Sequence, residues 1–255
     1  MKIWVLNKKT CALAIICCVL GIALLAMGRN ASVAVSGKQK DLPIYCVDKG
    51  DEKIISISFD AAWGNEDTED LIKILEQYNV KATFFVVGDW VDKYPESVKA
   101  LSDAGHEIMN HSNTHPHMPE LSEDKMKEQI NECNNKIEAI TGVRPILFRA
   151  PYGDYNNAVV KTVRDCGCYC IQWSIDSLDW KDLSPDEIYE RVMKKVAPGG
   201  IALFHNAAKN TPAALPKILE KLKADGYELV PISQLIYADN YEIDLTGKQI
   251  LKNEN

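Results

Sequence analysis

The 255-residue chain is long enough for one large domain with an appendage, because barrel and sandwich folds often use ~200 to 250 residues as one unit. Its formal net charge is -7 at pH 7, with 29 basic and 36 acidic residues, and the first 40 residues carry six of the bases and none of the acids. The rest of the chain is therefore strongly acidic, which excludes a surface suited to the phosphate backbone of nucleic acids.

An uncharged apolar run lies near the N-terminus, from Cys11 to Gly28. As a helix it would be about 27 Å long, close to the hydrocarbon thickness of a bilayer. Three lysines precede it, so the positive-inside rule places the rest of the chain outside the cytoplasm. We predict a signal-anchor or transmembrane segment at 1–28 and a polar stalk at 29–44. The protein would be tethered to the cell membrane, or secreted if the small residues 32–34 mark a cleavage site.

Five of the eight cysteines follow this segment: Cys46, Cys133, Cys166, Cys168 and Cys170. An odd number cannot pair completely within one chain. The last three alternate along an expected strand, where neighbours on one face are too far apart for a disulfide. We expect buried, small, apolar side chains here, and the disulfide state stays open.

From residue 45 onward, apolar runs of strand length alternate with helical patterns. Strands are expected at 54–60, 83–87, 106–110, 146–150, 169–173, 201–205 and 228–232. Helices are expected at 66–80, 95–104 and 126–140, and Ser184 and Thr211, each followed by proline, mark the starts of two more. This alternation predicts an α/β fold, a parallel sheet closed or nearly closed into a seven-stranded (β/α) barrel over 45–240, with a C-terminal tail at 241–255.

Two histidines stand four residues apart directly after the third expected strand, in the sequence HSNTH. If the backbone turns helically there, His111 and His115 can point both rings at one ion. Neutral imidazole suits zinc or a similar divalent metal. The spacing alone is a weak signal, because surface or capping histidines would look the same.

Other polar residues also fall at the ends of expected strands. Asp60 ends the first, Arg149 the fourth and His205 the sixth, and Asp176 and Asp179 follow the fifth. In a parallel barrel the C-terminal strand ends meet on one face, where the active sites of such folds lie. These distant residues are therefore predicted to converge on one site with the histidine pair.

Five ordered segments carry a resemblance to a known family: SFDAAWG (58–64), HSNTH (111–115), RAPYG (149–153), DSLDW (176–180) and IALFH (201–205). Over about residues 50 to 236 the chain resembles the NodB-homology polysaccharide deacetylases, carbohydrate esterase family 4. The AWG after the first segment is most similar to the sporulation-associated peptidoglycan deacetylase branch. The resemblance implies a distorted (β/α) barrel and a metal-dependent hydrolase that removes acetyl groups from N-acetylated sugars.

The resemblance also implies roles for residues that match its motifs. His111 and His115 would hold the metal, Zn²⁺ or else Co²⁺, which would polarise the amide carbonyl and activate a water. Asp60 would be the general base, oriented by Arg149. His205 would be the general acid that protonates the leaving amine.

The resemblance also implies a partner for the general acid and residues that contact the substrate. Asp179 would keep the His205 imidazole protonated, with Asp176 as the alternative partner. Tyr152 would donate its backbone N–H to the tetrahedral oxyanion. Trp180 and Leu203 would wall an apolar pocket for the acetyl methyl, although plain core residues would look the same in the sequence.

One position departs from the family pattern, which has a second acid directly after the base and a metal triad that includes it. Here that position is Ala61. A catalytic zinc site normally has three protein ligands. Glu66 or Asp67 could reach back to the metal, Asp60 could itself be a ligand, or two histidines could hold a hydrated ion.

This departure leaves two functions in view. The first is a peptidoglycan-type N-deacetylase outside the cytoplasm. The second is a glycan-binding barrel on the same fold that is catalytically weak or inactive. Hydrolysis of an O-acetyl ester, and a chitin-like or other acetylated polymer as substrate, fit the same motifs.

Overall fold

Residues 40–252 are described by the computed structural model. The expected membrane segment and most of the expected stalk lie outside these residues. Within residues 40–252, no helix combines the length and the apolar character that crossing a lipid bilayer requires.

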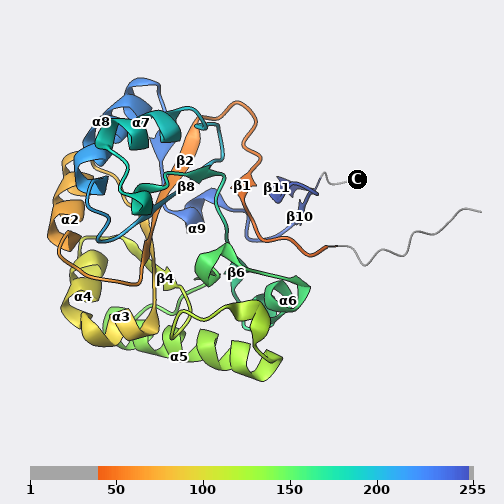
Figure 1. The fold of residues 1–255 in the computed structure, drawn as a ribbon. Coiled ribbons are helices and arrows are strands. Elements are labelled where there is room, and N and C mark those ends of the chain that lie inside the picture. Colours follow the sequence, from red (N-terminus) through yellow and green to blue (C-terminus); the bar gives the residue numbers. More distant parts are fainter. Residues whose placement is uncertain (1–39, 253–255) are drawn as a thin grey trace, which may run out of the picture. The chain divides into compact units, whose positions relative to one another are not determined.

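The centre of the domain is a curled sheet of parallel strands (Figure 1), in the order β6-β5-β4-β3-β2-β8-β7. The strand bounds are β2 Ile54–Ala61, β3 Thr83–Val86, β4 Glu107–Asn110, β5 Leu147–Phe148, β6 Tyr169–Cys170, β7 Ile175–Asp176 and β8 Ile201–His205. No strand pairing in the described part of the chain joins β6 to β7. The predicted α/β class is confirmed, and the barrel is a half-barrel instead of a closed one.

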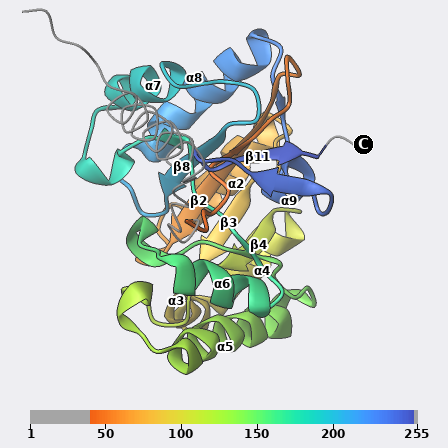
Figure 2. The ribbon, with the colours of Figure 1, turned by 90° about the vertical axis from the view of Figure 1, so that its right-hand side faces the viewer.

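Helices cover the outer face of this sheet. Their bounds are α2 Thr68–Gln77, α3 Gly88–Lys93, α4 Pro95–Asp103, α5 Glu123–Thr141, α6 Asn157–Asp165, α7 Pro185–Met193 and α8 Thr211–Ala224. Figure 2 shows the central strands between α7 and α8 on one side and α3, α5 and α6 on the other. The capping box predicted at Ser184 is present, and α5 ends at Gly142 in the left-handed conformation that glycine adopts easily.

The strand register sorts the side chains of the sheet onto two faces. Phe59 of β2 is paired with Phe84 of β3 and Phe204 of β8. These buried rings pack with Leu71 of α2 and Leu215 of α8 in one apolar cluster. This face of the sheet therefore holds the helices, since side chains two residues apart on a strand point the same way.

The opposite face carries polar groups at the C-terminal strand ends. Asp60 is paired with Phe85 of β3 and His205 of β8, and Ser58 is paired with Leu203. These residues alternate with the helix-facing ones, so they lie on the inner face of the curl. The register thus brings Asp60 and His205 side by side from positions 145 apart in the sequence.

Two expected strands differ from the prediction. Of the expected strand 169–173, only Tyr169–Cys170 form a strand, β6. The chain then crosses to the other end of the sheet, where Ile175–Asp176 form β7. The expected strand 228–232 is only β9 (Glu228–Leu229), which pairs with the start of β2. Pro231, which has no N–H to donate to a neighbouring strand, follows it and precedes α9 (Ile232–Leu235).

A segment near the start of the described chain bridges the gap in the half-barrel. The Ile44 N–H donates to the Cys170 carbonyl (2.8 Å), and the Ile44 carbonyl accepts from the Gln172 N–H (2.7 Å). Three residues later, the Val47 N–H donates to the Gly199 carbonyl just before β8 (2.9 Å). Residues 44–47 therefore connect β6 to the start of β8.

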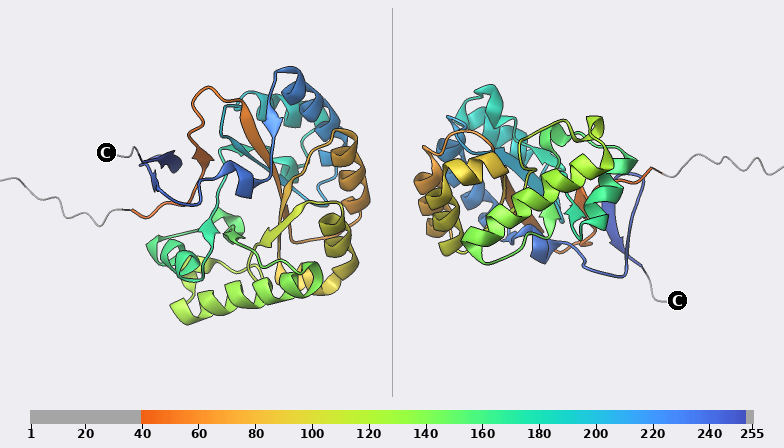
Figure 3. Two further views of the ribbon diagram at one scale, coloured as in Figure 1. Left: turned by 180° about the vertical axis from the view of Figure 1, so that it is seen from behind. Right: turned by 90° about the horizontal axis from the view of Figure 1, so that it is seen from below.

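A small second sheet adds the C-terminal segment to the domain. The strands β10 (Tyr241–Ile243) and β11 (Lys248–Leu251) form an antiparallel pair, and β11 runs parallel to β1 (Cys46–Val47). Figures 1 and 3 show this sheet on the side of the domain away from α2. Residues 241–251, expected as a tail, thus pair with the segment that bridges the half-barrel.

The cysteines of the described chain are free thiols. Cys133, Cys168 and Cys170 are buried among apolar side chains. Burial raises the pKa of Cys133 and of Cys170 to about 12, so these thiols are inert at neutral pH.

Candidate active site

A cleft of about 460 Å³ opens at the C-terminal ends of the strands. Its lining comes from the C-terminal parts of strands and from the loops that follow them, as the sequence predicted for a parallel sheet. The lining residues are Asp60, Ala62, Trp63, His111, His115, Tyr152, Gly153, Trp173, Asp176, Trp180, Leu203 and His205.

Asp60 is held by a fully buried arginine. Arg149 Nη1 donates to Asp60 Oδ1 at 2.7 Å, while Nη2 donates to Ser58 Oγ at 3.0 Å. Burial alone would raise the pKa of Asp60, but the Arg149 guanidinium and the nearby imidazoles lower it below its ordinary value. The guanidinium also lies 4.1 Å from the centre of the Phe85 ring. Asp60 is therefore an ionised carboxylate at neutral pH.

His111 is fixed in one tautomer by the backbone. Its Nδ1–H donates to the Arg149 carbonyl at 2.8 Å, which leaves the lone pair on Nε2 directed away from that bond. Nε2 lies 3.6 Å from Asp60 Oδ2. Burial lowers the pKa of His111 even though Asp60 opposes the shift. The imidazole is thus neutral, which is the state that binds a metal.

His115 lies beside His111, with the two ring centres 5.0 Å apart. Burial, and then the neighbouring His111, lower the pKa of His115 to about 4. Its backbone is left-handed, with φ 59°, which is uncommon for a residue with a side chain. The structure therefore brings the two predicted metal ligands together as neutral imidazoles.

The other candidate ligands lie differently. Glu66 and Asp67 line a separate pocket with Asp70 and Lys209. Asp67 Oδ2 accepts from the Ala207 N–H at 2.9 Å. Among residues 40–252 there is no group of three or more His, Cys, Asp or Glu side chains arranged to hold a metal ion.

Two imidazoles and a nearby carboxylate nevertheless match the chemistry of a divalent metal such as zinc. His111 satisfies a further requirement, because metal-binding histidines usually donate their second N–H to a carbonyl or carboxylate. The donor set therefore fits a metal held by fewer protein ligands than usual. Ala61 itself is 1% exposed and packs in the apolar cluster behind β2.

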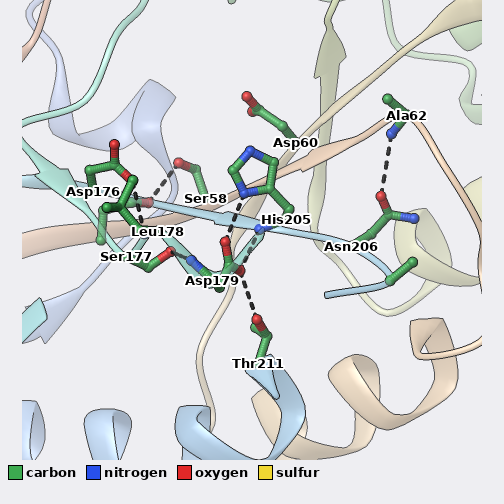
Figure 4. Close-up of polar contacts among 12 residues, drawn as sticks. Ser58, Asp60, Ala62, Asp176, Ser177, Leu178, Asp179, His205, Asn206 and Thr211 are labelled. Carbon is green, nitrogen blue, oxygen red and sulfur yellow. Dashed lines mark hydrogen bonds and ion pairs between the residues drawn. The ribbon is translucent and has the colours of Figure 1, made fainter. Parts of the chain in front are cut away.

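His205, at the end of β8, is tied to Asp179 (Figure 4). Its Nδ1 lies 2.8 Å from Asp179 Oδ1, and Asp179 Oδ2 accepts from the His205 N–H at 2.8 Å and from Thr211 Oγ1 at 2.7 Å. Burial would lower the pKa of His205, but the hydrogen bond and the charge of Asp179 outweigh it and raise the pKa. Asp176, the alternative partner, instead accepts from the Leu178 N–H at 2.9 Å.

Three aromatic side chains stand at the rim of the cleft. Trp63, Tyr152 and Trp180 are each more than half exposed, whereas Leu203 is buried at its floor. Tyr152 has φ 61°, and its ring lies edge-on to His115, with centres 4.5 Å apart. Exposed aromatic rings beside a cleft that holds charged and apolar groups suit the apolar faces of sugar rings.

Sequence reasoning gave no role to Trp63, Trp173 or Asn206, the first two of which line the cleft. Asn206 Oδ1 accepts from the Ala62 N–H at 3.3 Å, and its amide nitrogen donates to the carbonyls of Trp63 and Gly64. It thereby ties the loop that carries Trp63 to the end of β8. The position of Asn206 directly after His205 was the one sequence feature that could have indicated its role at the site.

Comparisons with known proteins agree with this arrangement. Residues 48–171 match the sequence profile of the family described as polysaccharide deacetylase. A peptidoglycan-N-acetylglucosamine deacetylase from Bacillus cereus is 37% identical over 190 residues, covering 72% of this chain and 89% of the relative. YlxY from Bacillus subtilis is 34% identical over 196 residues, covering 76% of this chain.

A solved structure adds a contrasting neighbour. BA3943 from Bacillus anthracis, described as a CE4 family pseudoenzyme, is 38% identical with a TM-score of 0.73, over 76% of this chain and 68% of that one. The chain spans 60% of YlxY and 39% of the Bacillus subtilis peptidoglycan-N-acetylmuramic acid deacetylase PdaC. The extent and level of identity to the Bacillus cereus enzyme show that the chain belongs to the polysaccharide deacetylases, carbohydrate esterase family 4.

Proposed function

We propose that this protein is a metal-dependent hydrolase that removes N-acetyl groups from a cell-wall polysaccharide, most simply peptidoglycan. The observation that carries the proposal is the presence of a base and an acid side by side in one cleft. Asp60 is held ionised by Arg149, and His205 is held protonated by Asp179, in a cleft that also contains two neutral imidazoles. Separating the pKa values of two groups in this way is how a site performs base and acid chemistry at one pH.

Each side chain then has a step in the hydrolysis. A divalent metal bound by His111 and His115 would polarise the amide carbonyl and make water more acidic. Asp60 takes the proton of the attacking water on Oδ2, the oxygen that Arg149 does not engage. His205 delivers the proton on Nε2 to the leaving nitrogen, since Nδ1 is engaged by Asp179.

The substrate groups would be held by the loops after β5 and β7 and by the cleft floor. The backbone N–H of Tyr152 would donate to the oxyanion, and Trp180 and Leu203 would enclose the acetyl methyl. The left-handed backbone of Tyr152 supports this role, since strained residues gather at functional sites. Peptidoglycan is the substrate class named in relatives such as the Bacillus cereus enzyme. The apolar run at 11–28 supports action outside the cytoplasm.

Acetate release from peptidoglycan fragments and chitooligosaccharides, with and without added Zn²⁺ or Co²⁺, tests the proposal. We expect Asp60→Asn to lower the rate at least ~100-fold, because the amide cannot accept the proton from water. Asp70→Asn, on the exposed first turn of α2, is the matched control and should keep the wild-type rate. No acetate release under any metal, or full activity of Asp60→Asn, would overturn the proposal.

The second candidate is a glycan-binding barrel without catalysis. Two observations favour it: alanine occupies position 61, and a 38% identical neighbour is described as a pseudoenzyme. A mutant of that neighbour is described as having restored activity. Saturable binding of the same fragments without acetate release would select this candidate.

A further inference from the structure

The loop that carries the histidine pair is strained. Ser112 and His115 both have left-handed backbones, with φ 71° and φ 59°. Such conformations are unfavourable for residues with a side chain and persist only where surrounding contacts enforce them. Within the loop, the His115 N–H donates to Ser112 Oγ at 3.0 Å. One internal bond does not determine a loop of this length, so the contacts around it decide where His115 lies.

One set of contacts comes from a single side chain of α5. Gln129 Oε1 accepts from the backbone N–H of Asn113 at 3.0 Å and of Thr114 at 2.9 Å. Thr114 Oγ1 also donates to it, at 3.3 Å. The two backbone N–H groups directly before His115 therefore have the same acceptor.

A second set comes from the first residues of α3. The Gly88 N–H donates to the Ser112 carbonyl and the Asp89 N–H to the Asn113 carbonyl, each at 2.9 Å. Gly88 lies so close that a Cβ would be 2.1 Å from Asn113 Oδ1 and 3.0 Å from the Asn113 Cα. The loop is thus held from one side through its carbonyls and from the other through its N–H groups.

The beginning of the loop is also fixed. Asn110 Oδ1 accepts from the Ser112 N–H at 2.7 Å, and Asn110 Nδ2 donates to Asn134 of α5 at 2.6 Å. His111 is bound through Nδ1 to the Arg149 carbonyl. His111 therefore has its own supports, whereas His115 depends on the path of the backbone from 112 to 114.

We infer that Gln129 is a positioning residue for His115. By fixing the backbone before His115, Gln129 holds the histidine pair in a metal-binding arrangement before a divalent metal binds. The inference rests on the proposed function, because it gives the pair the role of metal ligands. A preset pair loses less conformational entropy on binding, which offsets part of the affinity lost with the acid missing at position 61. Partners that orient metal ligands typically change metal affinity by about 10- to 100-fold when they are removed.

Two substitutions in the full-length protein separate the effect of the hydrogen-bond acceptor at position 129 from the effect of the side-chain volume. Gln129→Met keeps an unbranched side chain with good helix propensity but removes the acceptor. Gln129→Glu keeps an oxygen that can accept both N–H groups and serves as the conservative rescue. Glu128→Met, at an exposed neighbouring position on α5, is the matched control.

The first readout needs no metal. Amide hydrogen exchange of the segment 112–115 is expected to be ~10-fold or more faster in Gln129→Met than in the wild type, with α5 itself unchanged. The second readout is a titration with Co²⁺ alone, followed by its visible absorption. We expect about 10-fold or greater loss of Co²⁺ affinity in Gln129→Met, and affinity within ~3-fold of the wild type in Gln129→Glu and Glu128→Met.

Wild-type exchange and Co²⁺ affinity in Gln129→Met would overturn the inference. So would equal losses of affinity in the methionine and glutamate variants, because the acceptor would then be irrelevant. Acetate release by the metal-loaded wild type is measured in parallel. If Gln129→Met loses Co²⁺ affinity but the wild type releases no acetate, the proposed function fails and the positioning role stands. If the wild type releases acetate but Gln129→Met keeps its Co²⁺ affinity, the positioning role fails and the proposed function stands.

Discussion

Asp60 and His205 face one cleft, and each is tuned by a different buried partner. Arg149 lowers the pKa of Asp60, whereas Asp179 raises the pKa of His205. Both pKa shifts are opposite in direction to the effect of burial, because burial disfavours the charged form of each group. The two ion pairs therefore favour the carboxylate and the imidazolium together at neutral pH, which is the combination that amide hydrolysis requires.

Asp179→Asn should weaken the acid while leaving the base intact. Removing the charge and the hydrogen-bond acceptor lowers the pKa of His205, so His205 would lose its proton at lower pH. The alkaline limb of the pH–activity profile is then expected to move to lower pH, with kcat reduced by about 10²- to 10⁴-fold. Asp176→Asn is the comparison variant: Asp176 acts on His205 through its charge and accepts from the Leu178 N–H, so the alkaline limb should move less than in Asp179→Asn. An unchanged alkaline limb in Asp179→Asn would contradict the role of this pair.

Ala61→Asp should make stability depend on metal. Position 61 is buried in an apolar cluster, so a carboxylate there lacks a partner in the metal-free protein. We expect the metal-free Tm to fall by about 5 to 10 °C. The family pattern has an acid of the metal triad at position 61, so Zn²⁺ should raise the Tm of this variant more than that of the wild type, because binding to the folded state stabilises it.

Thermal unfolding with and without Zn²⁺ measures this effect, with Ala61→Asn as the neutral variant of equal size. The amide should show the loss of stability without the added response to Zn²⁺. Equal Zn²⁺ responses in the wild type and in Ala61→Asp would mean that a side chain at position 61 does not reach the metal.

At the scale of elements, patterns within one segment were predicted well. The stripe on α5 is buried at Met126, Ile130, Cys133 and Ile137, as its helical spacing indicated. Partners between segments were not predictable to the same degree. Ile171 fits a strand, but only the folded chain shows that it pairs with Ile44 while the following residues cross to β8.

In the site, too, some residues could be placed from the sequence and others could not. Asp60, His111, Arg149 and His205 were placed together because parallel strands end on one side of a sheet. The choice between Asp176 and Asp179, and the placing of Glu66 away from the histidine pair, depend on loop paths that no short sequence pattern records.

His106, which precedes β4, illustrates how one side chain joins two elements. Its Nδ1 accepts from the Ala82 N–H ahead of β3 at 3.2 Å, so the folded state requires an unprotonated Nδ1. Burial, and then the charge of Lys81, lower the pKa of His106 to about 4. The unfolded chain, with an ordinary histidine pKa of about 6.5, binds a proton that the folded chain does not.

Stability should therefore be complete above pH ~6.5 and decline as the pH falls toward 4. This one group is expected to contribute about 2 kcal/mol of lost stability between pH 7.5 and 5. Urea unfolding of the wild type and of His106→Gln at both pH values isolates the contribution, since other titrating groups, including His111 and His115, are common to both. A glutamine variant with the same pH dependence as the wild type would contradict this assignment.

At the scale of the whole domain, the gap in the half-barrel is bridged by residues 44–47. This bridge also joins the C-terminal sheet to the rest of the fold, because β1 pairs with β11. Its contact with β8 depends on Gly199, where φ is 73° and a Cβ would lie 1.7 Å from the Val47 carbonyl oxygen. Only a residue without a side chain lets the two backbones approach this closely.

Gly199→Ala should therefore displace the bridge and destabilise the domain. Gly226→Ala is the matched control, because Gly226 also has a left-handed backbone, with φ 83°, but a Cβ there would meet nothing within 4 Å. The control is expected to lose about 1 to 2 kcal/mol from backbone strain alone, and Gly199→Ala at least ~2 kcal/mol more, as measured by urea unfolding. Equal losses would mean that the bridge adds little to the stability of the half-barrel. A larger loss at Gly199 would show that residues 44–47 hold together the sheet that positions Asp60 and His205.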